Sequence, residues 1–355
     1  MNKAEQLYNE WKSLQPIVGR KQYLLSQRFT VDYNFNSNHM EGNTLTYGQT
    51  EFLLLFGKVF GEGDLQDYNE MKASQVGLTM MSEQAQLKDV PLTQNFIRQL
   101  HKVLLRENYT VYKNLPGGFT TSYVIHARQY KTRPNSVITR YGDRFDYASP
   151  EETPALMGDL VDWYNEAEQS ACCTPVELAA LFHYRYIRIH PFEDGNGRIA
   201  RLMVNYILAR HDWPMIVFRN RDKYHYLETL HQSDLKVGKE PSLGANAKLN
   251  QITPFLKYFN KTVINEIKYN IDFIKEQSPG VWWYDGRKIT FRSPSTNIML
   301  QMMLENPDIT IEELAHKSGI VTSAVKKQLQ NMAEKGYIQR IGNDRGWYVF
   351  ATQSI

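Results

Sequence analysis

The stretch HPFEDGNGRIAR, residues 190–201, constrains the fold most, because it places polar and flexible groups between two segments that both read as buried helix. The segment before it, Thr174–Ile189, opens with a Thr-Pro-Val-Glu capping box, and apolar residues at helical spacing resume from about Gly197. The sequence therefore predicts a helix, a short polar loop and a second helix that begins within this stretch.

The residues at the start of the second helix have the properties of an anion site. Unpaired amides and the positive end of the helix dipole favour an anion there, and Gly195 and Gly197, on either side of Asn196, let the backbone approach it closely. Arg198 and Arg201 are three residues apart, so they share a helix face and direct two cations at the same place. The pattern predicts a cradle for a polyphosphate.

Three further side chains of the stretch indicate what the cradle does. Asp194 suggests a divalent metal, since Mg²⁺ prefers one or two carboxylates together with phosphate oxygens and water. His190 ionises near neutral pH and could take a proton from an attacking hydroxyl, and Phe192 reads as an apolar anchor for the loop. Together these groups predict transfer of a phosphorus-containing group to a hydroxyl.

His-Pro-Phe-x-Asp-Gly-Asn-Gly-Arg-x-x-Arg is the signature of Fic (Fido) domain proteins, and the chain resembles this family over about residues 95–260. The resemblance implies a mostly helical core that moves AMP from ATP onto a Ser, Thr or Tyr hydroxyl of a target protein. It also implies roles for individual residues. His190 is the general base, Asp194 holds Mg²⁺, Arg201 engages the γ-phosphate, and the remaining phosphate contacts come from Gly195, Asn196, Gly197 and Arg198.

The same resemblance assigns residues outside the signature. Residues 116–154 are rich in Gly, Pro, Thr, Ser and Tyr, with β-type alternation near Val137, and read as a β-hairpin with flanking loops. Within them the stretch Arg133-Pro-Asn-Ser-Val137 would supply the flap on which the target adds a strand, although a plain surface hairpin is the alternative. Val137 would then clamp the target. Tyr224 falls where an aromatic packs against the adenine, although an ordinary core tyrosine is an equally good interpretation. His231 stands where some relatives carry an asparagine.

A second resemblance lies near the N-terminus. Ser37-Asn-His-Met-Glu41-Gly42 is similar to the [S/T]-x-x-x-E-[G/N] helix of Fic proteins that carry their own inhibitor ahead of the catalytic core, the class II type. Gly42 looks like the residue after a helix, so Glu41 would lie at the negative end of that helix, where a carboxylate needs a compensating cation. Arg201 is the obvious candidate for that cation.

The whole chain reads as mainly α, in three parts. We expect an N-terminal helical region over residues 1–94, a catalytic domain over 95–275, and a winged helix-turn-helix over 285–355. In the last part a Thr310–Glu313 capping box starts one helix, a second helix ends at Gly336, and two short strands follow. Further helices are expected over 43–60, 92–107, 153–168 and 254–275.

Composition leaves several functions open. The net charge is +3 over 355 residues, far below the positive excess typical of proteins that mainly bind nucleic acid. The adjacent Cys172 and Cys173 fit a reducing cytoplasm. No segment reads as a signal peptide or membrane span.

Two alternatives to AMP transfer remain open. One keeps the fold but transfers UMP or phosphocholine, or removes AMP. Another is a DNA-binding regulator, with Lys326, Lys327, Arg340 and Arg345 on the winged helix, which could equally bind a protein or a second subunit in a homodimer. Self-modification is also expected of the transferase.

Overall fold

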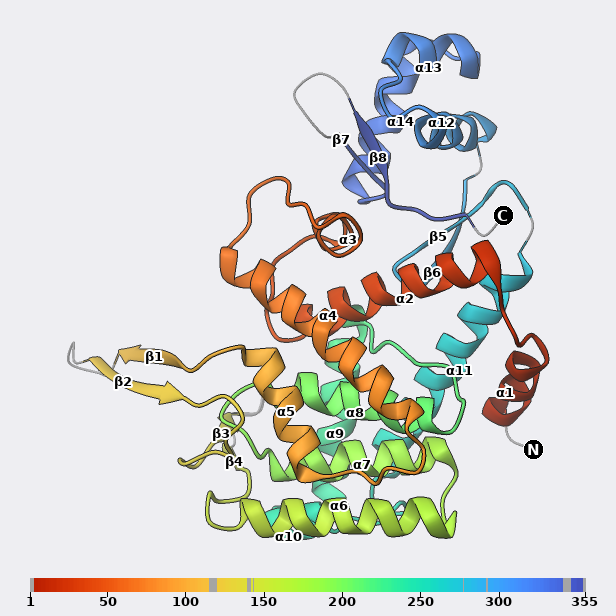
Figure 1. Ribbon diagram of the computed structural model, residues 1–355. Coiled ribbons are helices and arrows are strands. Elements are labelled where there is room, and N and C mark those ends of the chain that lie inside the picture. The colour runs from red at the N-terminus through yellow and green to blue at the C-terminus, as the bar shows by residue number, and fades with distance from the viewer. Residues whose placement is uncertain are drawn as a thin grey trace. The chain divides into compact units, whose positions relative to one another are not determined.

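A computed structural model of the chain describes residues 3–114, 120–138, 142, 144–276, 278–291, 293–340 and 346–353. The described residues are mostly helical, with four two-stranded antiparallel hairpins (Figure 1). They form two compact units, each made of segments that are distant in the sequence. The first unit contains Met1–Phe35, Thr44–Tyr68 and Asn265–Ile355, and the second contains Asn36–Asn43 and Asn69–Ile264. The expected division into three domains stays a prediction.

The second unit is a helical bundle that carries the HPFEDGNGRIAR stretch. Its helices are most of α4 (Leu65–Gln86), α5 (Gln94–Leu105), α6 (Thr153–Ser170), α7 (Pro175–Ile189), α8 (Asn196–Arg210), α9 (Lys223–Val237), α10 (Pro241–Ala245) and the first half of α11 (Thr253–Lys275), with a 3₁₀ turn at Asn220–Asp222. Helix α7 packs against α8, α6 and α10 (Figure 1). Both α7 and α8 are buried on nearly all sides, so the loop between them is held at the centre of the unit.

The helix boundaries follow the capping residues. Thr174 accepts from the backbone N–H of Glu177, whose carboxylate accepts in return from Thr174 N, so the expected capping box before α7 is confirmed. The single helix expected over 43–60 is wrong: α3 covers only Tyr47–Phe56. A capping box at Thr46 starts it late, and Gly57, in the left-handed conformation at φ 66°, ends it early.

Two hairpins follow α5. The flap is confirmed as β3 (Ser136–Ile138) paired with β4 (Arg144–Asp146), with Val137 opposite Phe145. The other hairpin, β1 (Tyr109–Asn114) with β2 (Thr120–Ile125), was not predicted, because the run of turn-forming residues that joins its strands reads as a loop. Thr139 and Asp143 of the expected flap turn lie outside the described residues.

The first unit contains the winged helix-turn-helix, which is confirmed. Before it come α1 (Lys3–Ser13), most of α2 (Gly19–His39), α3 and a hairpin of β5 (Val281–Tyr284) and β6 (Arg287–Thr290). The winged helix itself consists of α12 (Pro294–Glu305), α13 (Ile311–Ser318), α14 (Thr322–Glu334), β7 (Ile338–Arg340) and β8 (Trp347–Val349). The Thr310–Glu313 box caps α13, and Gly336, at φ 73°, follows α14 as expected.

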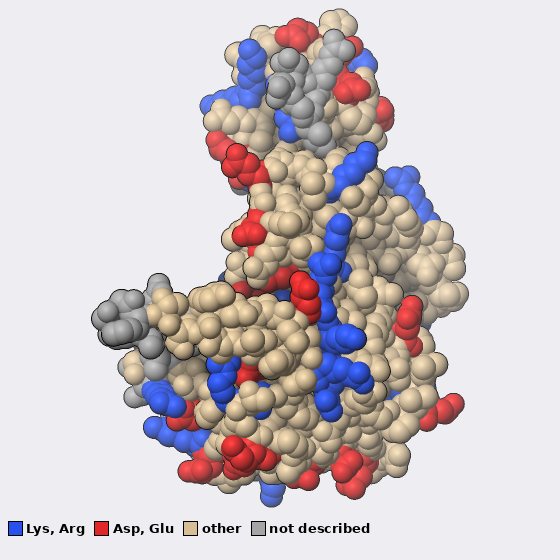
Figure 2. All heavy atoms as spheres, turned by 60° about the vertical axis from the view of Figure 1, so that its left-hand side comes forward, with Lys and Arg blue, Asp and Glu red and all other residues tan. Residues whose placement is uncertain are grey.

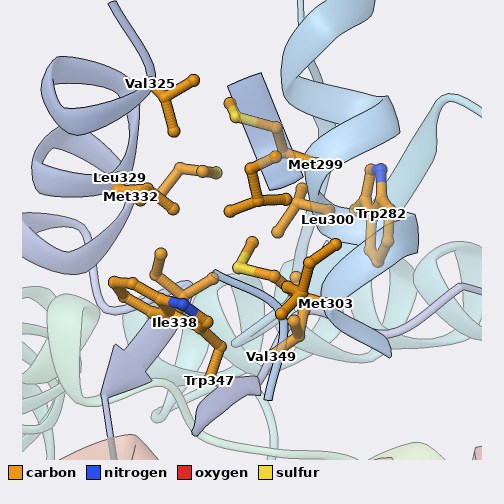
Figure 3. Close-up of a cluster of buried hydrophobic side chains, with 13 residues drawn as sticks. Trp282, Met299, Leu300, Met303, Val325, Leu329, Met332, Ile338, Trp347 and Val349 are labelled. Atoms are coloured by element: carbon orange, nitrogen blue, oxygen red, sulfur yellow. The ribbon is translucent and has the colours of Figure 1, made fainter. Parts of the chain in front are cut away.

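The winged helix has a hydrophobic core of its own. Side chains from α12, α14, β7 and β8 converge with Trp282 of β5 in Figure 3, among them Leu300, Val325, Leu329 and Ile338. Arg345, expected on the wing, lies outside the described residues. Figure 2 shows Lys and Arg side chains interspersed with Asp and Glu, and neither sign covers the face that it presents. No helix among the described residues has the length and apolar character needed to cross a membrane.

Helix α3 contacts strand β8 within the first unit. The Tyr348 ring lies against Phe52 and Phe56, at centroid distances of 5.2 and 5.6 Å. Gly48 is required here, because a Cβ at this position would overlap the Phe350 ring. The Tyr348 hydroxyl donates to Oε1 of Glu51 at 3.2 Å, so the wing strand is tied to α3 by polar as well as apolar contacts.

Candidate active site

A cavity of about 580 Å³ lies in the second unit, beside the loop between α7 and α8. This volume is within the range of small-molecule sites. The cavity brings together seven residues that the sequence analysis singled out: Glu41, Val137, His190, Gly197, Arg201, Tyr224 and His231. These residues come from four separate stretches of the chain, so their convergence is a finding of the structure.

The loop itself is closed by two residues of the signature. Phe192 is fully buried, and its ring stacks on His101 with centroids 3.8 Å apart. The Asn196 side chain accepts from Phe192 N–H at 3.0 Å and donates to Phe192 O at 2.7 Å. The side-chain amide of Asn196 is therefore used to close the loop. Its backbone N–H, at the start of α8, is the group that could bind an anion.

The N-terminus of α8 has the expected form of an anion cradle. Gly195 is its N-cap at φ 78°, a conformation that glycine adopts without strain, and no side chain caps the helix. The Arg198 side chain is nearly buried, and its Nε has no hydrogen-bond partner among the described residues. A buried donor without a partner is costly, and a phosphate oxygen would satisfy it.

Asp194 lies at the edge of the cradle as an ionised carboxylate. Its Oδ1 accepts from Gly195 N–H at 2.6 Å, and its Oδ2 accepts from the Tyr109 hydroxyl at 2.8 Å and from Arg198 at 3.2 Å. Burial raises its pKa, but Arg198, Tyr109 and Gly195 outweigh burial and lower it overall. A half-exposed, charged carboxylate beside a phosphate cradle fits Mg²⁺, which needs few protein ligands.

His190 is the C-cap of α7 and adopts a left-handed conformation, φ 52° and ψ 60°. For a residue other than glycine this is strained, and the surroundings must hold it. Its ring stacks on Tyr147, with centroids 4.0 Å apart. Burial and nearby Lys131 lower the pKa of His190 to about 4, against opposing contributions from Glu41, Ile187 O and Asp194. The ring is therefore neutral at pH 7 and able to accept a proton.

Glu41 occupies the cradle. Its Oε1 accepts from Arg201 Nη2 at 2.7 Å, and Arg201 also donates to Ser37 Oγ at 3.0 Å and to Ser37 O at 2.8 Å. A Cβ on Gly197 would overlap Oε1 of Glu41, so this oxygen lies directly over the first turn of α8. Burial raises the pKa of Glu41, but Arg201 and Arg198 lower it overall, and the carboxylate is charged.

The helix that precedes Glu41 ends earlier than expected. Helix α2 stops at His39, so Glu41 lies in the turn that follows and Gly42, at φ 102°, comes three residues after the helix. The backbone N–H of Glu41 donates to Asn38 O at 2.9 Å, which keeps the turn close to the helix end. Lys223 donates to Met40 O at 2.6 Å and fixes the turn from the side of α9.

The remaining expected residues line the open side of the cavity. Val137 is 42% exposed and Tyr224 is 66% exposed, so Tyr224 is not a core tyrosine. Three residues that shape the site were missed by the sequence analysis: Tyr109, Lys131 and Tyr147. They lie 43 to 85 residues away from the groups that they contact, and no local pattern marks them.

The model of the Fic/DOC family matches residues 91–208. The crystal structure of a Fic domain containing signaling protein from Bacteroides thetaiotaomicron VPI-5482 is 51% identical in sequence, with a TM-score of 0.70. The match covers 76% of this chain and 96% of that one. The chain belongs to the Fic family. A winged helix-turn-helix DNA-binding family model matches residues 299–339.

More distant Fic relatives include two nematode proteins. The protein adenylyltransferase fic-1 of Caenorhabditis elegans is 26% identical over 291 residues, which are 82% of this chain and 50% of the relative. Its homologue in Caenorhabditis briggsae is 26% identical over 275 residues, 78% of this chain and 47% of the relative. The chain thus spans about half the length of the curated relatives it matches.

Proposed function

We propose that this Fic protein is an ATP-dependent protein adenylyltransferase that Glu41 holds in an inhibited state. The observation that carries the proposal is the carboxylate of Glu41 in the anion cradle of α8, paired with Arg201. A site that attracts one anion from its own chain is suited to binding another. The names of the nematode relatives support adenylyl transfer as the reaction.

In the proposed reaction, the hydroxyl of a target side chain attacks the α-phosphorus of ATP. The new bond joins the hydroxyl oxygen to AMP, the bond to pyrophosphate breaks, and the hydroxyl proton passes to the neutral ring of His190. The amides at the start of α8 and the cation of Arg198 would hold the phosphates. Mg²⁺, held by Asp194 and phosphate oxygens, would neutralise part of the triphosphate charge.

Inhibition follows from competition for one arginine. Arg201 donates three hydrogen bonds to Ser37 and Glu41, and the Glu41 carboxylate adds negative potential where the γ-phosphate would lie. ATP bound in spite of Glu41 would place its α-phosphate out of line with the target hydroxyl. A misplacement of this kind can cost on the order of 10² in rate.

The test is Glu41→Gly, incubated with Mg²⁺ and with ATP labelled at the α or at the γ position. We expect this variant to incorporate more α label than the unmodified protein, into itself and into added proteins, and no γ label. Adding Arg201→Ala should cancel the gain. Glu62→Gly, which removes an exposed glutamate from another loop, is the control and should leave incorporation unchanged.

The outcomes separate the alternatives. Retention of γ label would indicate a kinase. Release of AMP from a previously modified protein, lost in Glu41→Gly, would indicate de-AMPylation, and α label from UTP in preference to ATP would indicate UMP transfer. If Glu41→Gly incorporates no more label than the unmodified protein, inhibition by Glu41 is wrong.

A further inference from the structure

Residues 131–135 bind four consecutive backbone carbonyl groups, from the last residue of α7 into the HPFEDGNGRIAR loop. Nζ of Lys131 donates to Ile189 O at 3.1 Å and to His190 O at 2.9 Å. The backbone N–H of Lys131 donates to Pro191 O at 2.9 Å, and Nδ2 of Asn135 donates to Phe192 O at 3.0 Å. We call residues 131–135 the strap.

The strap also holds the next residue of the loop. Both Thr132 and Arg133 donate to the carboxylate of Glu193, at 3.2 to 3.4 Å. The chain from Ile189 to Glu193, which includes His190, therefore has a partner in the strap at every residue. Such continuous pairing restricts the backbone far more than one contact would.

Lys131 is an unusual residue for this position. It is 3% exposed, and lysine is almost never buried unless it is paired. Its three Nζ partners are the two carbonyls and Oδ1 of Asn135 at 2.9 Å, all of them uncharged. Two of these are the last carbonyls of α7, where the helix dipole favours a cation. The ammonium group thus supplies the hydrogen bonds that the helix end lacks.

Asn135 connects the loop to the ring on which His190 stacks. Its backbone carbonyl accepts from the N–H of Tyr147 at 3.3 Å, while its side chain bonds Lys131 and Phe192 O. Strand β3 begins at the next residue, and Val137 faces the cavity one residue later. The flap, the Tyr147 ring and the backbone of His190 therefore share one anchor.

From this geometry we propose that Lys131 and Asn135 are positioning residues for His190. They hold the strained backbone of His190 and fix its position relative to the flap. A target segment seated on β3 would then be placed at a fixed distance from the base. The inference deepens the proposed function and rests on it. A general base must be accurately placed only if a target hydroxyl is presented to it.

The test uses Lys131→Met in the Glu41→Gly background, which removes the three donors but keeps an apolar side chain of similar length. We expect the rate of self-incorporation from ATP to fall about 100-fold, because a displacement of about 1 Å at the base has this effect. Binding of Mg²⁺ and a non-transferable α,β-methylene ATP, measured by calorimetry, should change less than about twofold. Lys131→Arg, which keeps donors and charge, should recover most of the rate.

Two further variants complete the design. Asn135→Ala should lower the rate by about tenfold, because it loosens the same loop. This variant tests the proposal if Lys131→Met does not fold. Lys102→Met, an exposed lysine on α5, is the matched control and should leave the rate unchanged. Hydrogen exchange provides a readout that does not need activity: the amides of His190 and Tyr147 should exchange faster in Lys131→Met, while those of α6 keep their rates.

Each result decides the proposal. Activity equal to that of the Glu41→Gly background in either strap variant overturns it. So does a loss of ATP binding in proportion to the loss of rate, which would show general damage instead of positioning. If Glu41→Gly itself is inactive, the proposed function fails, and hydrogen exchange alone then decides whether the strap holds the loop.

Discussion

His190 carries two costs, a left-handed backbone and burial of an ionisable ring, and its neighbours offset both. The N–H of His190 donates to Tyr186 O at 2.9 Å, its carbonyl accepts from Lys131, and its ring is stacked on Tyr147. Burial favours the uncharged ring, so the same environment that costs stability keeps the residue ready to accept a proton.

His190→Ala in the Glu41→Gly background should lower the rate of AMP incorporation by about 10² to 10⁴, as expected for loss of a general base. ATP binding should be retained, because the amides of α8 and Arg198 are not altered. Single-turnover rates and calorimetry check the two expectations. His316→Ala, at an exposed position of α13, is the control. Full incorporation by His190→Ala would assign the base to another residue.

Asp194→Asn should weaken binding of ATP in the presence of Mg²⁺ by on the order of tenfold, about 1.4 kcal/mol, and leave binding without the metal less affected. An amide has no charge for a hard cation, and it would also replace the ion pair with Arg198, at 3.2 Å, by a weaker neutral contact. Calorimetry with and without Mg²⁺ measures both. Asp212→Asn, an exposed partner of Lys88, is the control. An unaltered effect of Mg²⁺ would mean that another group holds the metal.

At this scale the sequence predicts the residues of the signature but not all of their contacts. The order of His190, Asp194, Gly197 and Arg201 is a local pattern, and its chemistry can be argued from spacing. The contacts of Asn196 with Phe192 and of Lys131 with His190 depend on how the loop folds back and on a segment about 60 residues earlier. No local rule contains that information.

Among the elements, the ends of helices are the best predicted. Thr174, Thr310 and Gly336 mark boundaries that the structure confirms, since a cap acts on the backbone within a few residues. Elements whose stability comes from pairing with another segment are harder to predict from the sequence. Strands β1 and β2 are held by their pairing with each other. Helix α3 is shortened by Thr46 and Gly57, although the apolar residues between and beyond them predicted a longer helix.

The contact between α3 and β8 has a titratable group at its centre. Burial raises the pKa of Glu51 to about 8, with a further increase from Asp32 and an opposing effect of the Tyr348 hydroxyl. The folded chain therefore keeps a proton that the unfolded chain loses above its ordinary pKa near 4.5. The free energy of unfolding should fall as pH rises from about 4.5 to 8, by up to about 1.4 kcal/mol per pH unit.

Glu51→Gln should remove this dependence, because the amide cannot ionise and its oxygen can still accept from Tyr348. We expect a higher melting temperature than that of the unmodified protein at pH 8, and a difference that narrows toward pH 5. Thermal unfolding across this pH range measures it. Glu62→Gln, an exposed glutamate in the loop after α3, should show no such trend. A variant less stable at pH 8 would show that the carboxylate is paired and charged.

For the whole molecule, the division of the chain is not sequential. Residues 36–43, which contain Ser37 and Glu41, belong to the second unit although the residues on both sides belong to the first. The winged helix shares the first unit with α1 and α3. Such an arrangement depends on contacts between residues more than 200 positions apart, as between Arg28 and Asn270, and composition along the chain does not reveal it.

Glycine at position 197 leaves room over α8 for an oxygen of either a phosphate or the Glu41 carboxylate. In the proposed mechanism these two are rivals of different kinds, since ATP arrives from solution and Glu41 is attached to the chain. A tethered group has an effective concentration that its linker sets, in the millimolar range for short links, and dilution of the protein does not alter it. The resting state of each molecule is then independent of how many copies a cell contains.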